Sequence, residues 1–210
     1  MNRPADKLEF EINIDREKAA ARQEKLAELR AVAPDQRQSC SGEILAILEA
    51  SKAWQAACSP LLYYPLRSEP DLSPLFADRR RTIVLPRVTE NGLELRAYSG
   101  DKSLRSSRFG MLEPDPDNSQ LIPSAQIDLA IIPGLAFDPD SGIRLGRGGG
   151  YYDRLLADTH FSAMTIGVGF EFQIQRGLPA EPHDRPLAYL LSESGLRPTR
   201  AASARTQESG

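Results

Sequence analysis

Short apolar runs recur along this chain, and segments of helix or loop length separate them. The runs lie at residues 61–64, 82–85, 129–132, 164–168 and 188–191. The third, Leu-Ala-Ile-Ile, is apolar throughout, which is typical of a strand buried on both faces of a parallel sheet. Strands that alternate with helix-length segments and right-handed crossovers predict an α/β fold. We therefore expect three layers, with helices on both faces of a mainly parallel sheet.

The turn dipeptide Asn91-Gly92 stands between two runs that can form strands, residues 83–85 and 93–98. Asn-Gly favours the positive φ angles of a tight hairpin turn. We expect one antiparallel hairpin at this point of the sheet.

The chain has 210 residues, of which 40% are hydrophobic, and neither a repeat nor a flexible linker divides it. This length supports one core, so we expect a single domain over residues 15–196. Residues 1–14 lack apolar periodicity and are expected to form a loose extension. Residues 197–210 are polar and small, and we expect them to be disordered.

Two helices are expected near the beginning of the chain. Asp15 can cap a helix over residues 16–30, which is rich in Ala, Glu, Lys, Arg and Leu. Pro34 and Asp35 then lead into a second helix. Lys18 and Arg22 lie four residues apart on the first helix, so their side chains share one face. They can clamp a polyphosphate, or they can simply be solvated.

Composition excludes several classes of protein. The formal net charge of −3 argues against nucleic-acid binding, which normally shows a basic excess. No run approaches the roughly 20 apolar residues that span a membrane, and the polar N-terminal segment lacks the apolar core of a signal peptide. Cys40 and Cys58 have no metal-ligand spacing, nor do His160 and His183 form a zinc cluster. We expect reduced thiols and a cytoplasmic location.

Residues 142–153 read Gly-Ile-Arg-Leu-Gly-Arg-Gly-Gly-Gly-Tyr-Tyr-Asp. Glycines let backbone N–H groups approach an anion closely, and Arg144 and Arg147 add positive charge. Tyr151 begins a helical pattern, so the bound anion would lie at a helix N-terminus. Asp153, in the first turn, could hold a magnesium ion. The run lacks the Gly-Lys-Ser/Thr ending of a P-loop, and the alternative is a tight strand-to-helix connection.

This run and the segment before it, Asp-Leu-Ala-Ile-Ile-Pro-Gly-Leu-Ala-Phe-Asp at 128–138, resemble the signature of the 5-formyltetrahydrofolate cyclo-ligase family. The resemblance covers roughly residues 18–195 and includes Leu85-Pro-Arg87, Phe109-Gly, Glu113-Pro114 and Pro182-His-Asp184. It implies a Rossmann-like α/β fold. It also implies ATP- and Mg²⁺-dependent cyclisation of 5-formyltetrahydrofolate to 5,10-methenyltetrahydrofolate, with release of ADP and phosphate, through a phosphorylated formyl oxygen.

The resemblance also implies roles for individual residues. ATP would contact Lys18, Arg22, Arg144, Leu145, Gly146, Arg147, Gly148, Gly149, Gly150, Tyr151 and Tyr152. The folate would contact Tyr64, Glu69 (or Asp71 in its place), Phe109, Arg147, Gly148, Gly149, Gly150 and Tyr151. Arg147 and Tyr151 would be catalytic, and Asp153 and Asp184 would hold Mg²⁺. Many members of the family have a lysine where this chain has Gly149.

Several of these residues also have a structural interpretation. Tyr64 can be strand packing, Glu69 a charge at the start of a helix, Phe109 a core residue and Asp184 a turn former. Two other functions also remain open. One is a binding module without turnover, and the other is a sugar-phosphate isomerase or acyl-CoA transferase on a similar fold. Magnesium-dependent consumption of ATP distinguishes a cyclo-ligase from both.

Overall fold

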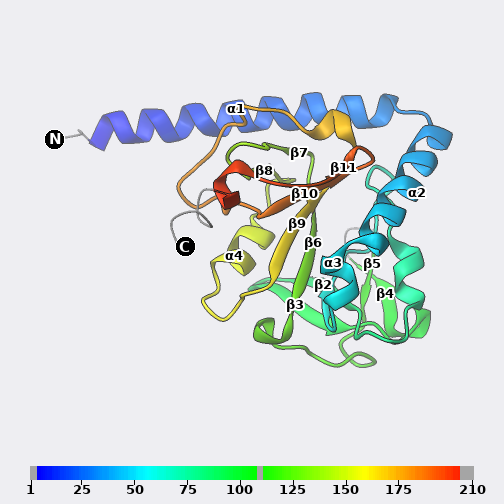
Figure 1. The fold of residues 1–210 in the computed structure, drawn as a ribbon. Coiled ribbons are helices and arrows are strands. Elements are labelled where there is room, and N and C mark those ends of the chain that lie inside the picture. Colours follow the sequence, from blue (N-terminus) through cyan, green and yellow to red (C-terminus); the bar gives the residue numbers. More distant parts are fainter. Residues whose placement is uncertain (1–3, 108–110, 204–210) are drawn as a thin grey trace.

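The computed structural model describes residues 4–107 and 111–203, with side chains from residue 13 onward. At its centre is a seven-stranded sheet in the order β11-β10-β9-β6-β1-β2-β3 (Figure 1). Strands β10 to β2 in this order are parallel, and the edge strands β3 and β11 pair antiparallel. The strands are β1 (Pro60–Leu61), β2 (Val84–Thr89), β3 (Gly92–Ala97), β6 (Leu129–Pro133), β9 (Met164–Val168), β10 (Tyr189–Ser192) and β11 (Gly195–Pro198). The expected mainly parallel sheet is confirmed.

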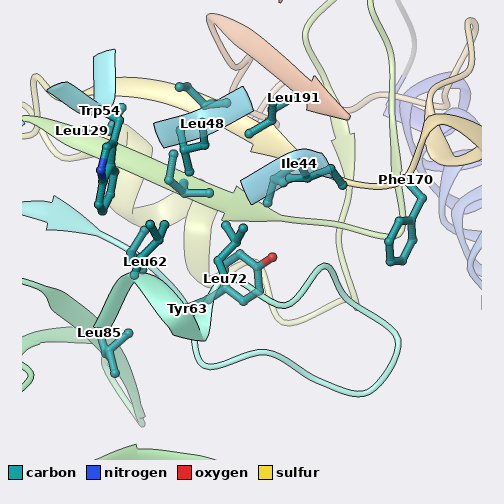
Figure 2. Close-up of a cluster of buried hydrophobic side chains, with 14 of the residues drawn as sticks. Ile44, Leu48, Trp54, Leu62, Tyr63, Leu72, Leu85, Leu129, Phe170 and Leu191 are labelled. Carbon is teal, nitrogen blue, oxygen red and sulfur yellow. The ribbon is translucent and has the colours of Figure 1, made fainter. Parts of the chain in front are cut away.

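Helices cover both faces of the sheet, as expected. The helices α1 (Pro4–Ala31), α2 (Pro34–Ala50) and α3 (Lys52–Ala56) supply Leu29, Ile44, Leu48 and Trp54 to one buried cluster. Leu129 of β6 (Figure 2) belongs to this cluster, and so does Ile131. The next residues on the strand, Ala130 and Ile132, join a second cluster with Leu155 of α4 (Tyr151–Ala157). Because alternate side chains of a strand point to opposite faces, β6 is buried on both sides.

The first helix is longer than expected. It begins at Pro4 rather than near Asp15, so the prediction of a loose segment is wrong for residues 4–14. Proline suits the first turn of a helix, and residues 7–9 and 11 have good helix propensity. Adding residues to an existing helix costs far less than nucleating one, so the segment needs no apolar stripe of its own. In Figure 1 the N-terminal part of α1 extends beyond the rest of the molecule.

The C-terminal segment is also more ordered than expected. Residues 197 and 198 belong to β11, which pairs with β10. Thr199 is fully buried, and its hydroxyl donates to the Leu187 carbonyl over 2.9 Å. The prediction of disorder is therefore wrong for residues 197–203, because pairing and burial outweigh a polar composition. Residues 204–210 lie outside the described part of the chain.

The expected hairpin is present. Strands β2 and β3 pair antiparallel from Val84 with Ala97 to Thr89 with Gly92, and Gly92 has a φ of 136°. Two short antiparallel pairs were not expected: β4 (Leu104–Ser106) with β5 (Leu112–Pro114), and β7 (Ala136–Phe137) with β8 (Arg144–Leu145). Segments this short carry no clear periodicity, so sequence patterns do not reveal them.

The strand order indicates at which edge of the sheet a ligand site is expected. The chain runs from β1 to β2 on one side, whereas β6, β9 and β10 follow on the other side of β1. The carboxyl ends of β1 and β6 therefore flank a topological switch point, where open α/β sheets usually bind ligands. Among the described residues, no helix combines the length and apolarity needed to cross a membrane.

Candidate active site

A cavity of about 540 Å³ opens at this edge of the sheet. Tyr63 and Tyr64 line it just after β1, and Pro133 and Gly134 line it at the end of β6. The glycine loop, defined as residues 146–150, and the first turn of α4 form another part of its wall. The cavity thus joins the glycine loop, which sequence patterns marked as an anion site, to Tyr64, which the resemblance assigned to the folate.

The three consecutive glycines of the glycine loop differ in their geometry. Gly148 and Gly150 have φ angles of 102° and 61°, which other residues rarely adopt. Gly149 has no such φ, but a Cβ at this position would lie 2.4 Å from the ring of Tyr151. Tyr151 therefore packs directly on the loop backbone, and the Arg154 guanidinium lies 5.0 Å from the centre of its ring.

The first helix contributes two cations to this region. The Arg22 Nε donates to the Gly146 carbonyl over 3.0 Å, so its guanidinium lies against the glycine loop. The Lys18 ammonium lies 2.6 Å from both Glu181 Oε2 and Asp184 Oδ2, and its side chain is 6% exposed. The two side chains share the face of α1 that meets the rest of the molecule. The solvated interpretation of this pair is therefore wrong for Lys18.

Glu181 is a residue that the sequence analysis missed. It pairs with Lys18, and its backbone N–H donates to Asp184 Oδ2 over 2.7 Å. Asp184 thus makes the turn contact expected of a loop aspartate and also neutralises a buried cation. The only sequence signal for this site was the presence of Glu181 three residues before Asp184. Its partner, Lys18, lies 163 residues away in the sequence, so the pair could not be recognised locally.

Asp153 has a different set of partners. Its Oδ1 lies 3.0 Å from the Arg144 guanidinium and accepts from the Arg185 N–H over 3.1 Å. Within residues 4–107 and 111–203, Oδ2 has no hydrogen-bond partner, and Asp153 lines the cavity. Magnesium commonly takes one or two carboxylates together with phosphate oxygens, so this oxygen beside the glycine loop suits the ion. Asp184 has its Oδ2 occupied by Lys18 and Glu181, which leaves only Oδ1 for a metal.

Glu69 lies in the wall of the cavity, with its side chain 9% exposed. Burial raises the pKa of its carboxyl, against the opposing effects of the Leu66 N–H and Arg147. Oε2 accepts from that N–H over 3.0 Å, and Oε1 lies 3.3 Å from the Arg147 guanidinium. Arg147 also donates to the Ser68 hydroxyl over 3.1 Å. Glu69, predicted for the folate, and Arg147, predicted for both ATP and the folate, are therefore in contact.

The two tyrosines after β1 differ. Tyr63 is buried, and its hydroxyl donates to the Pro70 carbonyl over 2.7 Å, which holds the segment that carries Glu69. Tyr64 is half-buried and lines the cavity, with its ring centre 6.1 Å from that of Phe76. Asp71 lies further along; its N–H donates to the Ser41 hydroxyl. Phe109, the remaining predicted folate contact, lies outside the described residues.

Sequence patterns did not reveal the apolar wall of the cavity. It is formed by the hairpin and the β5 region, through Pro86, Val88, Leu93, Met111 and Leu112. In the sequence these residues look like ordinary strand packing. Such a wall suits one face of a flat aromatic ligand, with Glu69 placed to accept hydrogen bonds from ring N–H groups.

Comparison with known proteins agrees with this architecture. Residues 14–193 match the model of the 5-formyltetrahydrofolate cyclo-ligase family. The 5-formyltetrahydrofolate cyclo-ligase of Escherichia coli K12 is 28% identical over 172 residues, which cover 79% of this chain and 94% of that protein. The NMR structure of the 5,10-methenyltetrahydrofolate synthetase of Aquifex aeolicus is 30% identical, with a TM-score of 0.77 over 87% of this chain and 93% of the other.

A second solved structure, a 5,10-methenyltetrahydrofolate synthetase from Mycoplasma pneumoniae, shares the fold with a TM-score of 0.67 and 21% identity. The matched region covers 84% of this chain and 98% of the Mycoplasma chain. The family match spans the glycine loop, the first-helix cations and the carboxylates that surround the cavity. From the match and the shared fold together, the chain belongs to the 5-formyltetrahydrofolate cyclo-ligase family.

Proposed function

We propose that this protein converts 5-formyltetrahydrofolate to 5,10-methenyltetrahydrofolate and consumes ATP in doing so. The observation that carries the proposal is the contact between Glu69 and Arg147 inside one cavity. Glu69 is suited to the amino and ring N–H groups of a pterin, and Arg147 belongs to a glycine loop suited to phosphates. A pterin and a nucleotide bound at these groups would be neighbours, as the reaction requires.

The chemistry explains the need for ATP. The N5-formyl group is an amide, and N10 cannot expel its oxygen directly. The formyl oxygen attacks the γ-phosphorus, the bond from that phosphorus to the β–γ bridging oxygen breaks, and ADP leaves. N10 then adds to the formyl carbon and loses its proton. The carbon–oxygen bond breaks, inorganic phosphate departs, and the N5–C–N10 bridge of the product remains.

The side chains around the cavity would mainly position the reactants and neutralise charge, since phosphoryl transfer needs little covalent help from a protein. We assign the phosphates to the glycine-loop N–H groups, Arg22 and Arg147. Lys18 could join them if phosphate oxygens replaced one of its carboxylate partners. Tyr64 and the apolar wall would hold the pterin, and Tyr151 would lie between the two substrates.

Asp153 is the residue best suited to hold Mg²⁺, because its Oδ2 has no partner among the described residues and the residue lines the cavity close to the glycine loop. Asp184 is the second candidate. When bound, the ion would neutralise charge on the phosphate oxygens. The metal role of both carboxylates is a proposal that mutation of each residue can test.

The direct test mixes the full chain with 5-formyltetrahydrofolate and MgATP and follows the absorbance of the methenyl product. We expect product to form in step with ADP, and no product when ATP is omitted or replaced by a non-hydrolysable analogue. A binding module would bind both ligands without product. An isomerase or acyl-CoA transferase would leave ATP intact. Either result would reject the proposal.

A further inference from the structure

Arg144 is a buried cation in the wall of the cavity, with its side chain 3% exposed. One terminal nitrogen lies 3.0 Å from Asp153 Oδ1, and the other donates to the Arg185 carbonyl over 3.3 Å. The guanidinium also lies 5.8 Å from the centre of the Tyr152 ring. Both terminal nitrogens thus contact protein groups, the Asp153 carboxylate and the Arg185 carbonyl.

The same contacts orient Asp153. Its Oδ1 receives two donors, the Arg144 guanidinium and the Arg185 N–H, whereas Oδ2 receives none from the described residues. A carboxylate with two donors on one oxygen has a defined plane, and its other oxygen faces a defined direction. Arg144 itself lies on β8, which pairs with β7 and gives the guanidinium a rigid base.

We propose that Arg144 is a positioning residue, which holds the Asp153 carboxylate so that Oδ2 is presented to the divalent cation accompanying the nucleotide. This proposal rests on the proposed function and assigns Arg144 a role through Asp153 in place of direct contact with phosphate. A guanidinium can bridge a carboxylate and a carbonyl at once because its donors form a planar fork, whereas a lysine ammonium cannot reproduce this geometry. Loss of such an outer partner of a metal ligand typically weakens metal binding 10- to 100-fold.

The test compares Arg144→Lys with the wild-type full chain. Binding of Mn²⁺, used in place of Mg²⁺, is measured by electron paramagnetic resonance in the presence of ADP. We expect affinity for Mn²⁺ to fall about tenfold or more in the variant. The matched control is Arg176→Lys, because Arg176 is an exposed arginine that pairs with Asp140 away from the cavity. The control should bind Mn²⁺ like the wild type.

A second measurement separates positioning from direct contact. ADP binding is measured by calorimetry with all divalent cations chelated. If Arg144 acts through Asp153, Arg144→Lys binds metal-free ADP as the wild type does. If Arg144 touches phosphate, metal-free ADP binding weakens as much as Mn²⁺ binding, and the proposal is overturned. Wild-type affinity for Mn²⁺ in a folded Arg144→Lys protein also overturns it.

Replacing a buried arginine can unfold a protein, so Asp153→Glu provides a second route. The added methylene moves the carboxylate away from the position set by Arg144 and the Arg185 N–H. We expect weaker Mn²⁺ binding with thermal stability close to that of the wild type; unchanged Mn²⁺ affinity would show that a fixed carboxylate is not needed. A wild-type protein that forms no product and binds no Mn²⁺ would instead overturn the proposed function, and this inference with it.

Discussion

Gly149 shows how a single residue can set the geometry of the site. Its missing Cβ leaves room for Tyr151, whose ring would otherwise be 2.4 Å away. We expect Gly149→Ala to displace the ring and to lower kcat more than it raises the KM for ATP, because the backbone N–H groups remain. Gly146→Ala is the matched control, since a Cβ there meets nothing within 4 Å. Steady-state kinetics of both variants check this; equal losses would show that Tyr151 is not the cause.

The ionised carboxylate of Glu69 destabilises the folded protein because it is buried. Because burial raises its pKa in the folded protein, folding is less favourable once the group ionises. Below the unfolded pKa, near 4.5, both states are protonated and Glu69→Gln should match the wild type. As the pH rises through the folded pKa, the wild type should lose stability relative to the variant.

The measurement is the free energy of unfolding of both proteins between pH 4 and 7, with the KM for 5-formyltetrahydrofolate at pH 7. We expect a more stable variant that binds folate more weakly, since an amide replaces an acceptor-only group. A stability difference that does not change with pH would contradict the assigned cost of burial.

At the scale of elements, Lys18 ties α1 to the segment that follows α4 and β9. Its partners Glu181 and Asp184 are both largely buried, so Lys18→Met leaves two carboxylates without their cation. Breaking a buried pair costs about 3 kcal/mol or more, and we expect a loss of that order in the free energy of unfolding.

Lys25, on the same helix, is the matched control. It pairs with Glu28, whose side chain is 40% exposed, so water can replace the lost partner. Lys25→Met should cost less than about 1 kcal/mol. Urea unfolding of the two variants measures both losses. Equal losses would show that the Lys18 contacts do not hold α1 in place.

At the scale of the whole molecule, we expect the cavity to couple the two substrates of the proposed reaction. Glu69 and Arg147 come from segments 78 residues apart, and each is the partner of the other when no ligand is bound. If the substrates bind at these two groups as proposed, the first to bind breaks this pair, and the second binds without that cost. Coupling of this kind is reciprocal.

The size of this coupling between the two substrates depends on how exposed the Glu69–Arg147 pair is. Because the Arg147 side chain is 41% exposed, the pair is worth at most about 1 kcal/mol, or about fivefold in affinity. We expect a non-hydrolysable ATP analogue to tighten folate binding by up to about that factor in calorimetry, and Glu69→Gln to abolish the effect. An equal effect in variant and wild type would locate the coupling elsewhere.

Local patterns in the chain predicted the layered fold and marked the glycine loop, whereas most other candidate site residues were assigned from the resemblance to a family. The apolar runs predicted the parallel strands, Asn91-Gly92 predicted the hairpin, and the glycine loop stood out by composition, because each signal lies within a few neighbouring residues. The ends of the chain were predicted less well. Helix propagation ordered residues 4–14, and strand pairing together with the burial of Thr199 ordered the segment that begins at residue 197.

Pairs between distant residues were decided only by the tertiary structure. The sequence marked Lys18 as a candidate phosphate contact, but its burial between Glu181 and Asp184 depends on how α1 crosses the molecule. The contact of Glu69 with Arg147 and the orientation of Asp153 by Arg144 are of the same kind. Charge, size and periodicity are properties of a segment and can be read locally. Which buried charge meets which partner depends on the path of the whole chain, and no local pattern records it.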